Sequence, residues 1–347
     1  MSEHEQMQEL IFKLSKANGV AGAEFSASEL VKKELSQYMP VSVDALGNVT
    51  GKLQGSGTHI LLDAHIDQIG MIVTSIDDDG FIKIDKCGGM DKRILAAHEV
   101  TVWGEKPLFG VVTSTPPHLS SKEDTGKAKD FDEIAIDVGL SKDKATALIR
   151  PGDRVTLNGK QQRLLGNRIC SPALDDRAGV ASILRCLELL KNKRHHCQIS
   201  VLFSVQEETG GSGAHTGGYT AAADESIAVD VSFAYAPDMP REKCGEMGKG
   251  TMLGISPILD HEMGRALEKV AKEKEIPMQF EVMGGKTGTN ADNIQLSREG
   301  TKMALLSIPL KNMHTSIEII DLQDVESTAR LMAEYILGRG KRGGDNA

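Results

Sequence analysis

Two adjacent acids follow an apolar stretch in the middle of the chain. Residues 199–205, ISVLFSV, have the composition of a buried strand, and Glu207 and Glu208 follow them, just before the glycine-rich turn at 210–214. Carboxylates held side by side repel each other unless a cation or a proton lies between them. The pair alone is typical of a solvated surface turn. A cation site is indicated only if other ligand-type residues lie near these two glutamates.

Histidine and carboxylate side chains also end other predicted strands or open a predicted helix. They are His65 and Asp67 after the apolar run 58–65, Asp230 after 226–230, His314 beyond 302–308, and Asp175 and Asp176 at the start of a helix over 175–192. In an open α/β sheet, ligands bind beyond the carboxyl ends of the strands. Histidine and carboxylate are ligands for Zn²⁺ or Co²⁺, and a carboxylate can bridge two metal ions. These segments therefore predict a metal site.

The order of predicted elements indicates an α/β fold. After residue 166, helical and strand-like patterns alternate, which predicts a mixed, largely parallel sheet with helices on both faces. From about 70 to 165, short β-like runs alternate instead with turn signals such as Asp79-Gly80. We therefore expect an α/β domain formed by residues 1–68 and 166–347, interrupted by a small all-β inserted domain at 69–165.

Two local signals add detail near the N-terminus. Ser26 with Glu29 three residues later has the pattern of a capping box, which predicts a helix over 27–38. Residues 41–53 read as a β-hairpin that turns at Gly47-Asn48.

The composition argues against a nucleic-acid-binding, secreted or membrane-spanning protein. The 347-residue chain carries a formal net charge of −9, which gives a nucleic-acid partner little support. The N-terminal segment lacks the apolar core of a signal peptide, and no stretch approaches the roughly 18 apolar residues of a membrane span. The five cysteines are odd in number and form no C-x-x-C pair, so we expect reduced thiols in a cytoplasmic protein.

Five segments, in this order, resemble those of a known enzyme family: HIDQIGMIV (65–73), ALDDRAG (173–179), SVQEETGGSGA (204–214), AVDVS (228–232) and NMHTSIEIID (312–321). They are similar to the glutamyl-aminopeptidase and tetrahedral-aminopeptidase family of dinuclear metallopeptidases, metallopeptidase family 42, whose members are often labelled endoglucanases. The resemblance spans essentially the whole chain. It implies a metal-dependent aminopeptidase that removes N-terminal residues from peptides, with two divalent metal ions per subunit, Zn or Co.

The resemblance also implies a role for each metal ligand. Asp175 would bridge the two metal ions. His65 and Asp230 would complete the coordination of one ion, and Glu208 and His314 that of the other.

Further roles follow for residues around the ligands. Glu207 would be the general base and acid, and Asp67 would be the carboxylate partner of His65. Asp176 is either a helix-start residue or a support for the ligands, and His118 in the PPHL turn could reach the rim of an active site across a dimer. Asn290 stands where the family has an aspartate, which changes the charge near the expected specificity pocket.

The inserted β unit resembles the dimerisation domain of the family. This implies a homo-oligomer with a dimer as its building block, of which the tetrahedral dodecamer of the family is one form, that acts on peptide substrates.

Three alternatives remain open. A related dinuclear hydrolase, such as a deacylase or a carboxypeptidase, would not require a free α-amine on its substrate. A glycoside hydrolase could use Glu207 and Glu208 as its paired acids, but such carboxylates stand about 5–9.5 Å apart across the sugar, an awkward demand on sequence neighbours. An inactive, metal-stabilised assembly protein would have no use for a base such as Glu207 beside its ligands.

Overall fold

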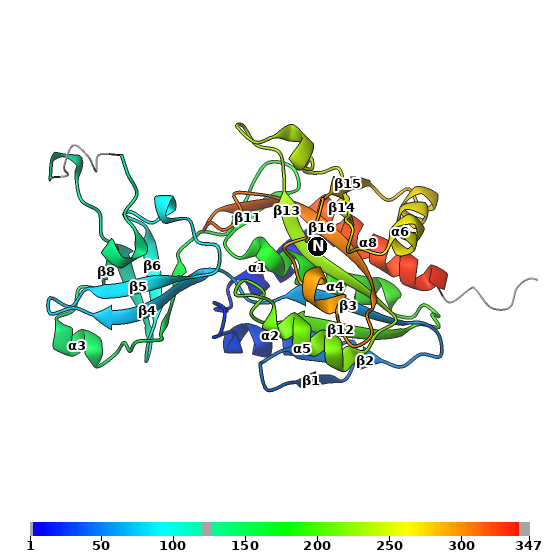
Figure 1. Cartoon of the computed structure of the whole chain (residues 1–347), viewed down its shortest axis with the longest axis horizontal. Coiled ribbons are helices and arrows are strands. Elements are labelled where there is room, and N and C mark those ends of the chain that lie inside the picture. The colour runs from blue at the N-terminus through cyan, green and yellow to red at the C-terminus, as the bar shows by residue number, and fades with distance from the viewer. Residues whose placement is uncertain (1–2, 120–125, 340–347) are drawn as a thin grey trace, which may run out of the picture.

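The computed structural model describes residues 3–119 and 126–339 (Figure 1). At its centre, four strands run parallel and next to one another, in the order β12 (Gln198–Ser204), β3 (His59–His65), β13 (Glu225–Phe233) and β16 (Lys302–Lys311). These strands are apolar almost throughout, because both of their faces are covered. The carboxyl ends of all four strands therefore lie at one edge of the sheet.

The flanking strands of this sheet are antiparallel. On one side lie β2 (Val49–Leu53) and β1 (Val41–Val43), and on the other β17 (Glu318–Asp321), β11 (Arg168–Ser171) and β10 (Gln162–Arg163). β14 (Thr251–Ile255) pairs antiparallel with β16 and parallel with β15 (Met278–Val282). The predicted mixed sheet and the hairpin at 41–53 are confirmed, but the sheet is parallel only among the four central strands and between β14 and β15.

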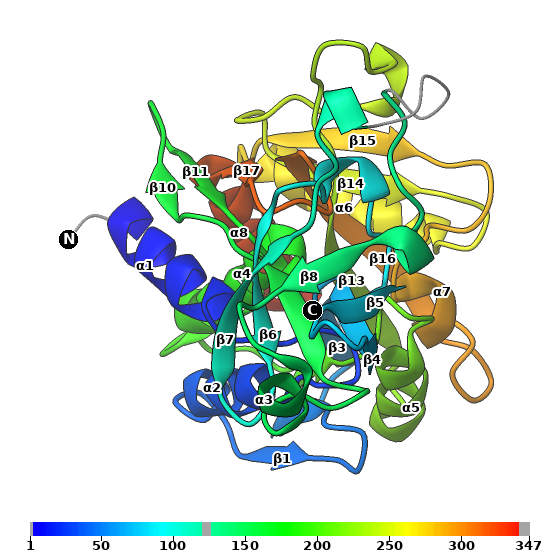
Figure 2. The same cartoon turned by 90° about the vertical axis from the view of Figure 1, so that its left-hand side faces the viewer.

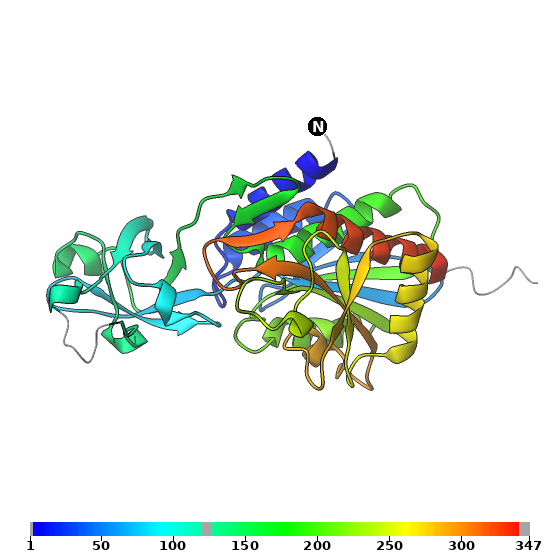
Figure 3. The same ribbon diagram turned by 90° about the horizontal axis from the view of Figure 1, so that it is seen from above.

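Helices cover both faces of the sheet. One face carries α1 (Glu3–Ser15), α4 (Leu174–Leu190), α6 (His261–Glu273) and α8 (Leu322–Arg339), and the other carries α5 (Ser212–Ala221) and α7 (Ala291–Ile294) (Figure 3). The alternation along β3 matches these two layers. Ile60 and Leu62 join the large core under α4, and Leu61 joins a smaller core with residues of α5 and α7. None of the helices in the described ranges is long and apolar enough to cross a membrane.

Two local predictions need correction. Helix α2 (Phe25–Leu35) begins before Ser26, because the N–H of Ser28 already donates to the carbonyl of Glu24 at 2.8 Å. Ser26 therefore lies inside the helix, and the predicted capping box is wrong. The glycine-rich segment is a turn only as far as Gly211, whose φ is 73°, and α5 starts at the next residue.

Residues 70–157 include a six-stranded closed barrel beside the α/β part (Figures 1 and 2). Around the barrel the strands follow the order β4 (Gly70–Ile76), β5 (Ile82–Cys87), β8 (Ala135–Asp137), β7 (Pro107–Val112), β6 (Glu99–Trp103) and β9 (Arg154–Leu157). Their inward side chains form a separate apolar cluster that includes Met71, Val100 and Val155. Short helices complete the chain: η1 (Lys92–Ile94), η2 (Pro117–Leu119), η3 (Phe131–Glu133), α3 (Lys142–Thr146) and η4 (Arg241–Lys243).

Candidate metal centre

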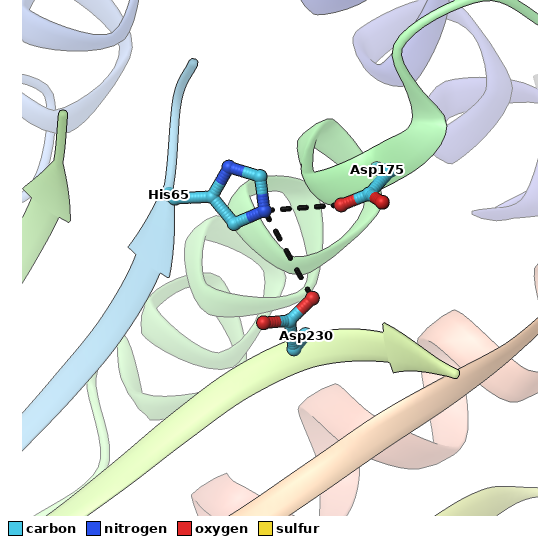
Figure 4. Close-up of side chains that lie close together, drawn as sticks. All are labelled: His65, Asp175 and Asp230. Carbon is cyan, nitrogen blue, oxygen red and sulfur yellow. Dashed lines mark hydrogen bonds and ion pairs between the residues drawn. The ribbon is translucent and has the colours of Figure 1, made fainter. Parts of the chain in front are cut away.

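Three elements bring one histidine and two aspartates together at the carboxyl edge of the sheet (Figure 4). His65 is the last residue of β3, Asp230 lies on the neighbouring strand β13, and Asp175 lies in the first turn of α4. The Nε2 atom of His65 is 3.0 Å from Oδ1 of Asp175 and 3.9 Å from Oδ1 of Asp230. All three side chains are buried and offer ligand atoms within 4.8 Å of one another.

A second group shares Asp175 with the first. The Nε2 atom of His314 lies 3.3 Å from Oδ2 of Asp175 and 3.3 Å from Oε1 of Glu208. These ligand atoms also lie within 4.8 Å of one another. One oxygen of Asp175 thus faces His65 and the other faces His314. The structure therefore brings together every residue that the sequence predicted as a metal ligand.

The electrostatics of these groups fit divalent cations. Burial raises the pKa of Asp230 well above its usual range. Burial also disfavours the charged form of Asp175, but its bonds to His314 and His65 hold the pKa of this carboxyl below its usual range. Within the described residues, no lysine or arginine forms an ion pair with Asp175, Asp230 or Glu208. A buried set of acids and imidazoles without such counter-charges is the donor set that Zn²⁺ or Co²⁺ accepts.

Glu207 lies beside the ligands and opens onto solvent space. With His65 and Glu208 it forms a third group whose ligand atoms lie within 4.8 Å of one another. All three line a cavity of about 560 Å³, which also reaches Asp175, Asp230 and His314. Burial raises the pKa of Glu207 to about 7; the neighbouring Glu208 adds to the rise and His65 opposes it.

Asp67 lies beside His65, as predicted, and makes a second contact that was not predicted. The chain leaves the strand after His65, so Nδ1 of His65 lies 3.0 Å from the backbone carbonyl of Asp67 and 3.5 Å from its carboxylate. The same carboxylate also accepts the backbone N–H groups of Glu207 and Glu208 at 3.0 and 3.1 Å. Asp67 is fully buried and fixes the turn that presents both glutamates.

The structure also places the three residues for which the sequence offered less specific roles. Asp176 is buried and accepts the N–H of Gly179 at 3.0 Å, which fits the helix-start interpretation. Asn290 is buried and donates to Asp63 at 2.9 Å and to Ser204 at 2.8 Å, and it does not line the cavity. His118 is exposed in η2 and does not line the cavity.

One supporting residue escaped the sequence analysis. Glu318 is 2% exposed, and its carboxylate accepts the N–H groups of Leu174 at 2.7 Å, Asp175 at 3.1 Å and His314 at 3.0 Å. It therefore fixes the backbone at two of the candidate ligands at once. Its only signal in the sequence is an acid within an apolar run four residues after His314, which resembles many surface strands.

Comparisons with known proteins agree with this geometry. The chain is 34% identical over 329 residues to a lysyl aminopeptidase of Pyrococcus furiosus, covering 93% of this chain and 94% of the relative. The solved structure of an aminopeptidase from the archaeon Desulfurococcus kamchatkensis superposes with a TM-score of 0.91 at 30% identity and covers 100% of both chains. The TET1 peptidase of Pyrococcus horikoshii, described as assembling into a tetrahedron or a large octahedral shell, has a TM-score of 0.84 at 30% identity and covers 95% of this chain and 99% of its own.

The family profile described as M42 glutamyl aminopeptidase matches residues 47–331, which include every candidate ligand. The chain thus belongs to the M42 aminopeptidase family and is a hydrolase of peptide bonds.

Proposed function

We propose that this aminopeptidase uses two divalent metal ions held by the ligands described above and Glu207 as its general base. The observation that carries the proposal is the pair of Asp175 oxygens, which face His65 on one side and His314 on the other. A carboxylate in this position can serve two metal ions at once. His65 and Asp230 would complete one site, and Glu208 and His314 the other, with Zn²⁺ or Co²⁺ as the expected ions.

The role of the bound ions would be to polarise the scissile carbonyl and to lower the pKa of water at the site. Glu207 lines the same cavity as the ligands and is half-buried, so its carboxylate can accept a proton from the attacking water. It would then deliver that proton to the leaving amine. Asp67 acts as a positioning residue, because its carboxylate holds the backbone of Glu207 and Glu208.

The free α-amine is the feature that distinguishes an aminopeptidase from a deacylase or a carboxypeptidase. A peptide's N-terminus is a cation, and the cavity at the candidate centre is lined by Glu207 and Glu208. The open side of the cavity would receive the first side chain of the substrate.

The barrel suggests how subunits assemble. We propose that residues 69–165 form an inserted domain that joins two chains into a dimer, and that dimers combine further into a dodecamer. Support comes from the dodecamer and the tetrahedron stated for similar TET1 peptidase structures. The exposed apolar side chains of Phe109 and Leu119, 60% and 72% exposed, add to this support. All five cysteines are free, which supports the expected cytoplasmic location.

The proposal is tested by hydrolysis of a panel of aminoacyl chromogenic amides after metal removal and after addition of Zn²⁺ or Co²⁺. We expect activity only with added metal, two bound ions per subunit by elemental analysis, and no cleavage of an N-acetylated control. Cleavage of the acetylated amide would identify a deacylase instead. An absence of turnover with two ions bound would contradict the aminopeptidase mechanism.

A further inference from the structure

A carboxylate outside the metal-ligand groups lines the same cavity. Glu281 lies on β15 and is half-buried at the cavity wall. Its Oε2 accepts the hydroxyl of Ser307 at 2.9 Å, and its Oε1 accepts the hydroxyl of Ser232. Both serines are buried, 1% and 8% exposed. Two buried donors therefore hold the carboxylate in one orientation.

The two serines also fix where Glu281 stands relative to the metal-ligand groups. Ser232 lies two residues after Asp230 on β13, so both side chains point to the same face of the sheet, about 7 Å apart along the strand. Ser307 is the register partner of Asp230 on the neighbouring strand β16. The serines therefore hold the carboxylate of Glu281 near the candidate ligand Asp230, at a separation that a long side chain such as lysine can span.

Part of the cavity lining is apolar. Phe233, Met283 and Leu305 line it together with Glu281. Lys286 also lines it, but its side chain is exposed and, in the described part of the chain, no ion pair joins it to Glu281. A fixed anion that shares the cavity with these apolar side chains and is not one of the candidate metal ligands fits a side chain with a hydrocarbon stem and a terminal cation.

We propose that Glu281 selects peptides whose N-terminal residue is lysine or arginine. This inference rests on the proposed function, because it assumes that the α-amine and the scissile bond lie at the metal centre. An aliphatic side chain would leave the half-buried carboxylate of Glu281 without a cationic partner, and an acidic one would meet a like charge. Glu281 is therefore a specificity-determining residue of the same site.

The test compares lysyl and norleucyl amides, which differ only in the terminal ammonium group, with arginyl and glutamyl amides alongside. For the unchanged, metal-loaded enzyme we expect kcat/KM for the lysyl amide to exceed that for the norleucyl amide by about 10- to 100-fold, the range of one charge-assisted contact. In Glu281→Gln that ratio should fall to within about 3-fold, since Gln keeps an oxygen for the serine hydroxyls. Glu268→Gln on α6 removes the same charge from an exposed position and should keep the ratio.

The role of Glu281 and the proposed aminopeptidase mechanism would be contradicted by different results. Hydrolysis of free-amine amides with the norleucyl amide equal to or better than the lysyl amide would overturn the role of Glu281 and leave the proposed function intact. The same conclusion would follow if Glu281→Gln and Glu268→Gln changed the ratio equally. If no amide is cleaved, the proposed function fails, and calorimetric titration with lysinamide and norleucinamide decides the selectivity. Tighter binding of lysinamide that is lost in Glu281→Gln would support the cation site, and equal binding would overturn it.

Discussion

Asp175 is the residue on which the two halves of the metal centre depend. Its two oxygens lie 3.0 Å from His65 and 3.3 Å from His314, and its backbone N–H is held by Glu318. The same Glu318 carboxylate holds the backbone of His314, so one buried acid sets the relative position of two ligands on distant segments. A ligand whose backbone is fixed in this way loses little conformational entropy when a metal ion binds.

Replacing Glu207 should impair catalysis without loss of the bound metal ions. Glu207→Gln keeps the size of the side chain but removes the proton acceptor, so we expect kcat to fall by about 100-fold or more, the range of general-base catalysis. Bound metal should stay at the unchanged enzyme's level, because the other five acids and imidazoles remain. Steady-state kinetics together with elemental analysis would check both expectations. Loss of metal along with activity would show that Glu207 is itself a ligand.

The pH dependence of the unchanged enzyme provides a second readout for the same residue. Glu207 must be ionised to accept a proton, and burial raises its pKa to about 7. Bound cations favour the carboxylate form, so kcat/KM should fall as the pH drops, through an ascending limb whose midpoint lies at or below about pH 7. Glu207→Gln should flatten that limb, and a retained limb would assign it to a different group.

At the scale of residues, the sequence pointed to the candidate metal ligands more clearly than to the residues that hold them in place. His65, Asp175, Glu208, Asp230 and His314 could be proposed as ligands because five ordered segments resemble the motifs of the family, and the structure groups their side chains. Asp67 was identified as the partner of His65, but the bonds of its carboxylate to the backbone of Glu207 and Glu208 were not predicted. Glu318 and Glu281 were missed, because a contact between two distant segments leaves no local pattern in either of them.

At the scale of elements, the parallel strands bring the ligands together. β3, β13 and β16 run parallel, so the ends that carry His65, Asp230 and the approach to His314 share one edge. The alternation of helices and strands was enough to predict this edge. It did not predict β17 and β11, whose antiparallel pairing brings the segment of Glu318 beside the start of α4. Antiparallel partners depend on pairing across the fold rather than on local periodicity.

Helix α8 contributes a prediction about stability that is separate from the metal centre. Asp324 in its first turn is fully buried and accepts the N–H groups of Gly248 and Gly250, both at 2.7 Å. Burial raises the pKa of Asp324 to about 7, above the value of about 3.9 for an unfolded aspartate. The folded state therefore holds this proton more tightly, so Asp324 lowers the free energy of unfolding progressively as the pH rises from about 4 to about 7.

We expect Asp324→Asn to remove this pH-dependent contribution. Between pH 5 and pH 8, the free energy of unfolding of the unchanged protein should fall relative to that of the variant by about 2 kcal/mol. Urea unfolding of both metal-free proteins at several pH values would measure the difference, and all other titrating groups contribute equally to both. Parallel pH curves would show that Asp324 is ionised in the folded state over the whole range.

At the scale of the whole molecule, the barrel and the α/β part have separate apolar cores. The barrel core includes Met71 and Val155, and the sheet has its own clusters on its two faces. The sequence indicated this division through the change from helical periodicity to short β runs with turn signals near residue 70. A second core beside the catalytic edge does not contribute any of the candidate ligands, so we expect it to serve assembly.

The proposed assembly predicts that the barrel surface controls the size of the particle. Phe109 on β7 is 60% exposed, and Phe109→Glu would place a charge in an apolar contact between chains, where desolvation makes it costly. We expect the mass measured by light scattering to fall to half or less of that of the unchanged protein, with an unchanged circular dichroism spectrum. Phe25→Glu is the matched control, because Phe25 is 78% exposed at the start of α2, outside the barrel. If the control lowers the mass and Phe109→Glu does not, the contact between subunits lies on the α/β part instead.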